Sequence, residues 1–544
     1  MCLLAACGGG DTPVSPSTES AAEPAAHEGR QHALAAAVPT QSQWSAPVAL
    51  TLVPASAANL PNGKVLLWSA QGRFDFITAP GSTYTALFDP VTGTVVERLA
   101  SETTHNMFCP GTTNLPDGRI LVNGGSSSAA TSLYDPATGT WSAVQQMNIP
   151  RGYNANTLLP DGSVLTLGGS WNGGTGNKHA EVWTAAGGWR RLTGVPVDQM
   201  VAPDPGGVYR GDNHMWLIPT GNGRVLQAGP SAAMNWIDTR GNGATTSAGV
   251  RGDDPYAING SAVMYDIGKI LKTGGAPAYE NVDATSNVHL IDVSAGSPIV
   301  RRLASMSYQR AFHNSVVLPN GQVLIVGGQT LPVPFSDNRS VLVPELWDPA
   351  TERFTALAPM QVPRNYHSTA LLLPDGRVVS MGGGLCGNGC AANHADLQIL
   401  TPYYLLNADG SPATRPVITR DRIRSGLRRD APSNYGQRGH GVCTGAHVLV
   451  DAHRQQRSTP HPAAVRSDRR EPVHARDADQ PRHRTARPLH AVRIECRRRA
   501  VHCEDAAPAR RRHAAAGAAR RPAVCCQPGE DGEPRGLRHR PDRL

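Results

Sequence analysis

Long hydrophobic runs are absent from this chain of 544 residues. No stretch of 18 apolar residues occurs in it, so no segment has the length and composition of a membrane-spanning helix. The chain is long enough to bury one large hydrophobic core or two to three ordinary ones. Its 57 glycines and 44 prolines indicate many tight turns.

Lysine is missing from residues 421–544, which contain 27 arginines against 14 Asp and Glu. This stretch carries a net charge of +13, so residues 1–420 carry −5 of the whole-chain charge of +8. A strongly basic stretch is typical of nucleic-acid binding. We nevertheless expect no nucleic-acid partner, because the stretch lacks the hydrophobic periodicity of a folded domain and has the composition of GC-rich DNA translated out of frame.

A charged leader is also missing at the N-terminus, together with most of an apolar signal core. The segment LAAC, which ends at Cys7, still resembles a bacterial lipobox and precedes a Gly-, Ser- and Pro-rich stretch. We therefore expect residues 1–43 to be a truncated lipoprotein signal and flexible tether, with Cys7 as the lipidation site. The alternative is that Cys7 is an ordinary cysteine. A bacterial protein of this kind would be exported, as a cell-envelope lipoprotein or an extracellular protein, and would meet a membrane only through the lipid.

One short phrase is present in seven copies, as Leu-Pro-Asp-Gly, Leu-Pro-Asn-Gly or a weaker variant, followed by an apolar run that ends in glycine. Such a turn needs glycine at its positive-φ position. The apolar run is short and rich in β-branched residues, which predicts a buried strand. The strong copies begin at Leu60, Leu115, Leu159, Leu318 and Leu373, and the weaker copies begin at Gly221 and Ile267.

Short strands in units of about 45 to 60 residues, each with a Gly-Gly signature, form the pattern of a kelch propeller. A second recurring phrase, such as LYDPATGTW from Leu133, predicts a strand, a turn and a further strand. The sequence therefore predicts an all-β fold in which residues 44–404 form a seven-bladed kelch-type β-propeller. Loops at one end of the central channel carry the function in such folds.

Unusual residues lie at nearly the same offset from the turn in three repeats. Cys109 and Tyr153 lie six residues before the leucine of their repeat, and Tyr366 lies seven residues before it, with His367 adjacent. Equivalent points of a propeller converge on its axis, so these side chains are expected to meet there. Together with Trp171 in GGSW they indicate a redox copper site. Taken singly, each is more often a buried cysteine or a packed tyrosine.

Several long phrases between Trp68 and Arg420 resemble the galactose oxidase and glyoxal oxidase family of copper radical oxidases. A single short motif of this kind would carry little weight, whereas six phrases in the same order are specific. The phrases are HNMFCPG from His105, RGYNAN from Arg151, GGSWNGG from Gly168, YRGDNHMWL from Tyr209, QAGPSAAMNW from Gln227, and YHSTALLLPDGRV from Tyr366 with GGGLCGNGC after it.

This resemblance implies a role for each axial residue. Cys109 and Tyr153 would form a thioether, and Tyr153 would bind one copper ion and carry a radical. Trp171 would stack over the thioether and protect the radical. Tyr366 would be the axial copper ligand and the base that accepts the alcohol proton, and His367 would be an equatorial ligand. Nitrogen and oxygen ligands in a tetragonal arrangement suit Cu(II).

Substrate-binding positions also follow from the resemblance. Arg210 matches the sugar-binding arginine of the family, whose guanidinium offers a fork of donors to vicinal hydroxyls; the alternative is a surface arginine in an ion pair. Tyr279, Phe312 and Phe335 match residues that line the pocket. Glu280 stands where galactose oxidase has glutamine, so galactose itself is not the expected substrate.

Cys386 and Cys390 flank a Gly-Asn-Gly segment. A disulfide across this loop suits an exported protein. A metal site is the alternative, but no further ligand residues lie near them in the sequence.

The C-terminal composition departs from the family pattern. Residues 405–437 begin as the Ig-like β-sandwich of the family would, whereas residues 438–544 are rich in Arg, Ala and Pro. A shift of one base permits a segment like the histidine-ligand segment of the family, with the histidine codon straddling Ala452 and His453. We therefore expect a frameshift near Gln437, a disordered out-of-frame tail and loss of the second histidine ligand. The alternative is a natural disordered basic tail.

The function implied is oxidation of a primary alcohol or aldehyde, in a sugar or a small molecule, by O2 with release of H2O2. We expect a monomer that is inactive as written, because the second histidine is lost. The alternative is a non-catalytic kelch propeller that binds a glycan or a protein at the cell surface.

Overall fold

The computed structural model describes residues 42–76, 81–220, 223–254 and 256–415. Cys7, residues 416–437 of the predicted sandwich and the predicted out-of-frame tail at 438–544 lie outside the described residues. Within the described ranges no helix has the length and hydrophobicity needed to cross a membrane. Those ranges contain three short 3-10 helices: η2 (Val197–Gln199), η3 (Val208–Asp212) and η4 (Tyr403–Leu405).

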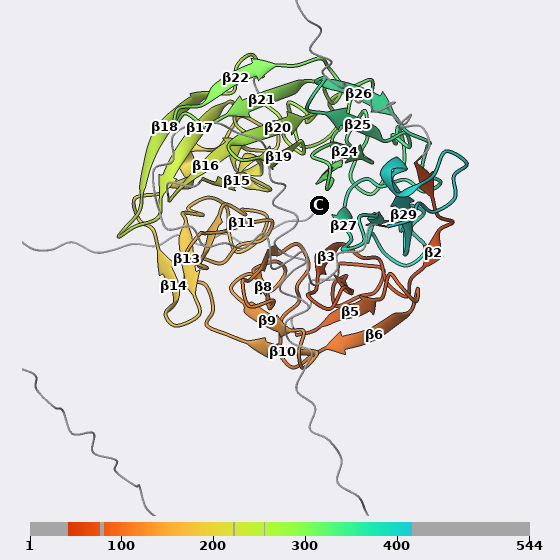
Figure 1. Cartoon of the computed structure of the whole chain (residues 1–544). Helices are drawn as coiled ribbons and strands as arrows, with labels where there is room; N and C mark the ends of the chain where they lie inside the picture. The colour runs from red at the N-terminus through yellow and green to blue at the C-terminus, as the bar shows by residue number, and fades with distance from the viewer. Residues whose placement is uncertain (1–41, 77–80, 221–222, 255, 416–544) are drawn as a thin grey trace, which may run out of the picture. The chain divides into compact units, whose positions relative to one another are not determined.

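Seven antiparallel sheets follow one another around a central axis, which confirms the all-β propeller prediction (Figure 1). Blade 1 contains β3 (Ser56–Asn59), β4 (Val65–Trp68), β5 (Thr83–Phe88) and β6 (Val95–Ala100). Blade 2 contains β7 (Gly111–Asn114), β8 (Ile120–Asn123), β9 (Thr131–Asp135) and β10 (Thr140–Ala143). Blade 3 contains β11 (Ala155–Leu158), β12 (Val164–Leu167), β13 (Glu181–Thr184) and β14 (Gly188–Arg191).

The next three blades repeat this order from the innermost strand to the outermost strand. Blade 4 contains β15 (Trp216–Pro219), β16 (Arg224–Gly229), β17 (Ala233–Asp238) and β18 (Ala244–Val250). Blade 5 contains β19 (Ser261–Asp266), β20 (Lys269–Thr273), β21 (Val288–Asp292) and β22 (Ile299–Arg302). Blade 6 contains β23 (Asn314–Val317), β24 (Val323–Val326), β25 (Glu345–Asp348) and β26 (Arg353–Ala356).

Blade 7 joins the two ends of the described chain. Its strands β27 (Ser368–Leu372), β28 (Val378–Gly382) and β29 (Asp396–Thr401) are extended by β1 (Gln43–Trp44) and β2 (Val48–Ala49), which both pair with β29. Trp44 lies opposite Leu400, and Val48 lies opposite Leu397. The innermost strand β27 contacts β3 of blade 1, so the ring is closed.

The repeated phrase forms the turn between the first and second strands of a blade. In blade 2 the Leu115 amide donates to the Arg119 carbonyl at 2.8 Å, and Gly118 takes a φ of 88°. The second Gly of the following pair allows close packing, because a Cβ on Gly125 would lie 2.3 Å from the Phe108 carbonyl oxygen. This contact brings the end of β8 against the segment that carries Cys109.

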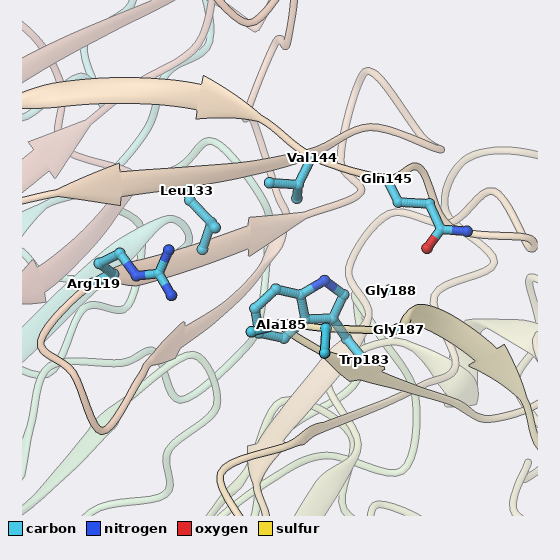
Figure 2. A pocket seen from close by; sticks show the side chains of 9 residues that line it. Arg119, Leu133, Val144, Gln145, Trp183, Ala185, Gly187 and Gly188 are labelled. Atoms are coloured by element: carbon cyan, nitrogen blue, oxygen red, sulfur yellow. The ribbon is translucent and has the colours of Figure 1, made fainter. Parts of the chain in front are cut away.

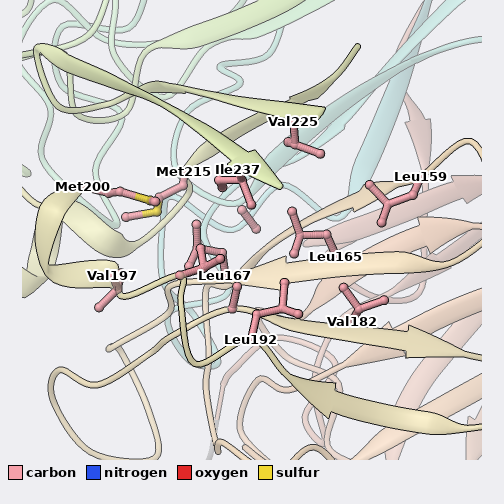
Figure 3. Packing of buried hydrophobic residues seen from close by; sticks show 13 residues of the cluster. Leu159, Leu165, Leu167, Val182, Leu192, Val197, Met200, Met215, Val225 and Ile237 are labelled. Atoms are coloured by element: carbon pink, nitrogen blue, oxygen red, sulfur yellow. The ribbon is translucent and has the colours of Figure 1, made fainter. Parts of the chain in front are cut away.

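The hydrophobic core is divided among the interfaces between blades. Figure 3 shows the cluster between blades 3 and 4, where Leu165 and Leu167 of β12 and Val182 of β13 pack against Val225 and Ile237. Leu165 and Leu167 are fully buried, which stabilises the fold by about 1.5–3 kcal/mol for each side chain. A scaffold packed in this way holds the loops at the axis in place.

Buried arginines attach the axial segments to their blades. They lie two residues before Tyr153, Phe312 and Tyr366, and each donates to the first glycine carbonyl of its Gly-Gly pair. Each also pairs with a carboxylate at the start of the third strand. The pairs are Arg151–Glu181 at 3.0 Å, Arg310–Glu345 at 2.9 Å and Arg364–Asp396 at 2.5 Å.

Candidate active site

Six successive blades present a non-glycine residue with positive φ just before the innermost strand. The Tyr153 amide donates to the Cys109 carbonyl at 2.8 Å, and the His214 amide donates to the Tyr153 carbonyl at 3.0 Å, so neighbouring positions are linked. A positive φ costs a non-glycine residue of order 1 kcal/mol or more. The positions are Cys109 (56°), Tyr153 (62°), His214 (56°), Asn259 (58°), Phe312 (62°) and His367 (66°).

The residues predicted from the repeats lie together at the axis. The hydroxyl oxygens of Tyr153 and Tyr366 are 2.5 Å apart, and the Tyr153 hydroxyl lies 2.8 Å from Nε2 of His367. Nδ1 of His367 donates to the Gly384 carbonyl at 2.6 Å, so Nε2 is the acceptor that faces Tyr153. The Cys109 sulfur lies 3.8 Å from the same Nε2.

Burial keeps these four groups uncharged. Loss of solvent raises the pKa of the Tyr153 and Tyr366 phenols and of the Cys109 thiol, and the nearby Cys109 raises the pKa of both phenols further, whereas the hydrogen bond from Tyr153 acts in the opposite direction on Tyr366. Burial also lowers the pKa of His367 to about 3, although its hydrogen bond to Gly384 acts in the opposite direction. A cation bound at this point would lower the pKa of the two phenols, because it stabilises the phenolate form.

Two phenol oxygens and one imidazole nitrogen therefore converge on a single point. This donor set fits a copper ion, for which N and O ligands are suited. Among the described residues no group of three or more His, Cys, Asp and Glu side chains is arranged to hold a metal. That finding agrees with the geometry, since two of the three donors here are tyrosines.

Aromatic rings enclose this point. The Trp171 ring lies 4.9 Å from the Tyr153 ring at 52°, and Phe108 meets Trp171 edge-on at 5.5 Å and His367 edge-on at 5.0 Å. The fully buried Phe108 thus separates the axial residues from the interior of blade 2. Trp171 itself is half-buried.

The predicted substrate residues form a second group beside the axis. Nη2 of Arg210 donates to Glu280 at 2.7 Å, and the Arg210 guanidinium lies 4.7 Å above the Tyr279 ring. The Tyr279 hydroxyl donates to the Tyr366 hydroxyl at 3.1 Å. Asp204 accepts from the Tyr279 amide at 2.8 Å and holds this loop in place. The side chains of Arg210 and Glu280 are one-third exposed, so solvent reaches this pair.

Phe312 and Phe335 complete the wall around Tyr366. Their rings lie 5.0 Å and 5.2 Å from the Tyr366 ring. Phe76 stacks between Phe335, at 5.4 Å, and Phe108, at 5.3 Å. All of these rings belong to one hydrophobic cluster with Tyr153 and Cys109.

Sequence reasoning missed three residues of this site. Phe76 and Phe108 are apolar aromatic residues without a charge or a metal-binding atom, although Phe108 directly precedes Cys109. His214 is exposed, and its ring lies 4.4 Å from the Tyr153 ring. It lies two residues before its innermost strand, the same offset that Cys109 and Tyr153 have, and this offset was the available signal.

Cys386 and Cys390 form a disulfide. Its loop supports the pocket, because the Gly387 amide donates to the Phe74 carbonyl at 2.9 Å and the Asn393 side chain donates to the same carbonyl at 3.1 Å. The disulfide loop therefore holds the segment that ends in Phe76.

Two surface hollows lie elsewhere on the described chain. One, of about 390 Å³, lies between blades 2 and 3, where Arg119, Leu133 and Val144 face Trp183 (Figure 2). The other, of about 520 Å³, is lined by Tyr308, Thr330 and residues 339–343. The linings of both hollows lack the residues predicted for the site.

This chain is similar to known oxidases. The family described as glyoxal oxidase N-terminus matches residues 269–388. A galactose oxidase from Gibberella zeae is 44% identical over 399 residues, which cover 71% of this chain and 58% of that protein. An aldehyde oxidase, GLOX, from Vitis pseudoreticulata is 29% identical over 304 residues, which cover 51% of this chain and 55% of that protein. The chain thus spans less than two thirds of the length of these relatives.

A solved structure of an oxidase is also similar to this chain. It is described as a novel fungal alcohol oxidase of the AA5 family in complex with copper. It matches with a TM-score of 0.66 and 43% sequence identity, over 69% of this chain and 80% of that structure.

Proposed function

Because the chain belongs to the family of galactose oxidases and glyoxal oxidases, we propose that it is built as a copper radical oxidase. The reaction is oxidation of a primary alcohol or an aldehyde by O2. An alcohol RCH2OH and O2 give the aldehyde RCHO and H2O2, so two electrons and two protons pass from the carbinol to oxygen. The observation that carries the proposal is the convergence of two side chains on the Tyr153 hydroxyl, which lies 2.5 Å from the Tyr366 hydroxyl and 2.8 Å from Nε2 of His367.

The three converging side chains would hold one copper ion. Bound copper supplies a one-electron acceptor and lowers the pKa of the phenols that bind it. Cys109 and Tyr153 would supply the second oxidising equivalent as a thioether-linked tyrosyl radical. The S–C bond of this thioether forms with loss of one hydrogen from the thiol and one from the phenol ring, which O2 takes up as H2O2.

The remaining residues orient the substrate and move its proton. Tyr366 accepts the alcohol proton, and the Tyr279 hydroxyl, which donates to Tyr366 at 3.1 Å, stabilises the phenolate form. Trp171 shields the Tyr153 ring from solvent. Arg210 and Glu280 bind substrate hydroxyls as a donor and an acceptor. Because the Glu280 carboxylate adds a charge and lacks the amide donor of a glutamine, galactose itself is not the expected substrate.

The ligand set of the described residues contains one histidine. We propose that the second histidine is lost through a frameshift near Gln437 and that the chain as written is therefore inactive. Three ligands hold copper more weakly than four, and the open end of the propeller would remain exposed. We further propose that the protein is exported, to the cell envelope or beyond.

Copper binding and H2O2 release separate this proposal from a non-catalytic propeller. Restoring the alternative frame from the proposed shift near Gln437 onward should produce a protein that binds one copper ion and releases H2O2 with a primary alcohol. In that protein Cys109→Ala should remove the thioether and most of the activity. Full activity and an unchanged radical absorption band in Cys109→Ala would exclude Cys109 from this role. No copper binding in the restored protein would favour a module that binds a glycan or a protein.

A further inference from the structure

Lys178 is a buried lysine with its full set of hydrogen bonds. The residue is 2% exposed, and its Nζ donates to the carbonyls of Pro150 at 2.5 Å, Asn172 at 3.1 Å and Gly173 at 2.8 Å. An ammonium group has three donors, so none is left over. Burial lowers the pKa of Lys178 to about 8, which leaves the group mostly charged at neutral pH.

The three carbonyls belong to two segments of the site. Pro150 lies three residues before Tyr153, whereas Asn172 and Gly173 directly follow Trp171. Lys178 thus bonds to the segment that leads to the phenol and to the segment that follows the indole.

These two segments pack without room for additional side chains. A Cβ on Gly152 would lie 2.7 Å from the Trp171 ring, and a Cβ on Gly173 would lie 2.5 Å from the Pro150 side chain. The backbone amides of this loop have other partners. The Ser170 amide donates to the Asp212 carboxylate at 2.8 Å, and the Trp171 amide donates to the Asn213 side-chain oxygen at 3.2 Å. The backbone carbonyls of Asn172 and Gly173 in the same loop accept from Lys178.

We propose that Lys178 is a positioning residue that fixes the Trp171 indole against the Tyr153 ring. Three carbonyl oxygens that point at one buried place repel one another unless a cation lies between them, and a compact ammonium fits there better than the planar guanidinium of arginine. The consequence for a radical on Tyr153 rests on the proposed function. The placement of Trp171 does not, and it can be measured without metal.

The test uses the metal-free chain as written. The fluorescence of Trp171 is obtained as the difference between the parent and Trp171→Phe, since the chain has nine tryptophans. Acrylamide quenching of this difference signal is compared in Lys178→Met and in Lys272→Met. Lys272 is also fully buried, but it pairs with Asp254 in blade 5 and has no bond to the Trp171 loop.

We expect Lys178→Met to raise the quenching constant of Trp171 by about twofold or more, because the loop opens locally, and Lys272→Met to leave it unchanged. An unchanged constant in Lys178→Met, or an equal rise in both variants, would overturn the proposal.

A milder variant keeps the test decisive if Lys178→Met does not fold. Lys178→Arg retains the charge but not the tetrahedral donors, so amide exchange of residues 170–177 should become faster while the other blades stay protected. Unchanged exchange in that loop would count against the proposal. Copper and O2 added to the frame-restored protein test the proposed function separately, since loss of two hydrogen atoms reports the thioether whatever the quenching result.

Discussion

At the scale of single residues, Glu280 limits how many Arg210 donors are available to a substrate. The carboxylate holds Nη2 of Arg210 at 2.7 Å, and Asp204 lies 3.7 Å from Nη1. The guanidinium is therefore partly occupied before any ligand arrives. A hydroxyl group must compete with a charged acceptor to reach it.

Glu280→Gln should release Arg210 and add an amide donor to the pocket. In a protein with a restored C-terminal frame, we expect KM for galactose to fall by about tenfold, the order of one good polar contact. The free energy of unfolding should change by less than about 1 kcal/mol, because the ion pair is one-third exposed. Steady-state kinetics and urea unfolding measure the two effects, and Arg210→Lys is the matched control. An unchanged KM would remove Glu280 from the set of specificity residues.

At the scale of elements, the buried Arg151–Glu181 pair connects the Tyr153 segment to β13. Both side chains are fully buried, and Arg151 also donates to the Gly168 carbonyl at 2.9 Å. A buried pair of this kind adds little net stability but makes each partner depend on the other.

Arg151→Ala should therefore destabilise the fold by about 3–5 kcal/mol, because Glu181 is left buried without its partner. Arg151→Met combined with Glu181→Leu should recover most of that loss. Thermal and urea unfolding of the single and double variants measure the difference. A double variant no more stable than Arg151→Ala would show that the ion pair does not dominate. The backbone contacts of Arg151, or the Asn148 and Ile149 amides that donate to Glu181, would then matter more.

The disulfide loop is a second element whose effect reaches the site. Removing the bond in Cys386→Ser/Cys390→Ser should cost about 2 kcal/mol by chain entropy, because the closed loop is short. It should also free the Phe74–Phe76 segment, so amide exchange there should become faster. If amide exchange became faster only in residues 386–390, the proposed link between this loop and the Phe74–Phe76 segment would be contradicted.

At the scale of the whole molecule, stability should depend on pH through buried histidines. His105 bonds to Ser132 and Gly124 at 2.9 Å, and burial lowers its pKa to about 4. Burial, with Arg310 and Lys272 nearby, lowers the pKa of His313 to about 3.

Both folded-state pKa values lie below the unfolded value of about 6.5, so their contribution is complete above pH 6.5 and declines as the pH falls. We expect a loss of up to about 2 kcal/mol for each histidine between pH 6.5 and pH 5, a window in which most carboxylates remain ionised in both states. Urea unfolding at pH 7.5 and pH 5 tests this, with His105→Asn as the control that should flatten the dependence. Equal free energies at the two pH values would contradict it.

The seven repeats predicted the propeller because each copy contains both the turn chemistry and the strand that follows it. The axial residues were predictable for a related reason. In a periodic fold, residues at the same offset from equivalent turns occupy equivalent places, so Cys109, Tyr153 and His367 converge, and Tyr366 reaches the axis as the neighbour of His367. His214 and Phe312 follow the same rule, but only Phe312 was named beforehand, and only through the family resemblance.

The sequence by itself therefore determined the all-β class, the number of blades and the residues that meet at the axis, because local turn and strand patterns repeat along it. Only the tertiary structure decided that Glu280 pairs with Arg210, that the Tyr279 hydroxyl faces Tyr366 and that Phe76 stacks between two other rings. Those contacts join loops that have no equivalent in other blades. Side-chain packing between such loops decides their geometry, and no periodic pattern encodes it.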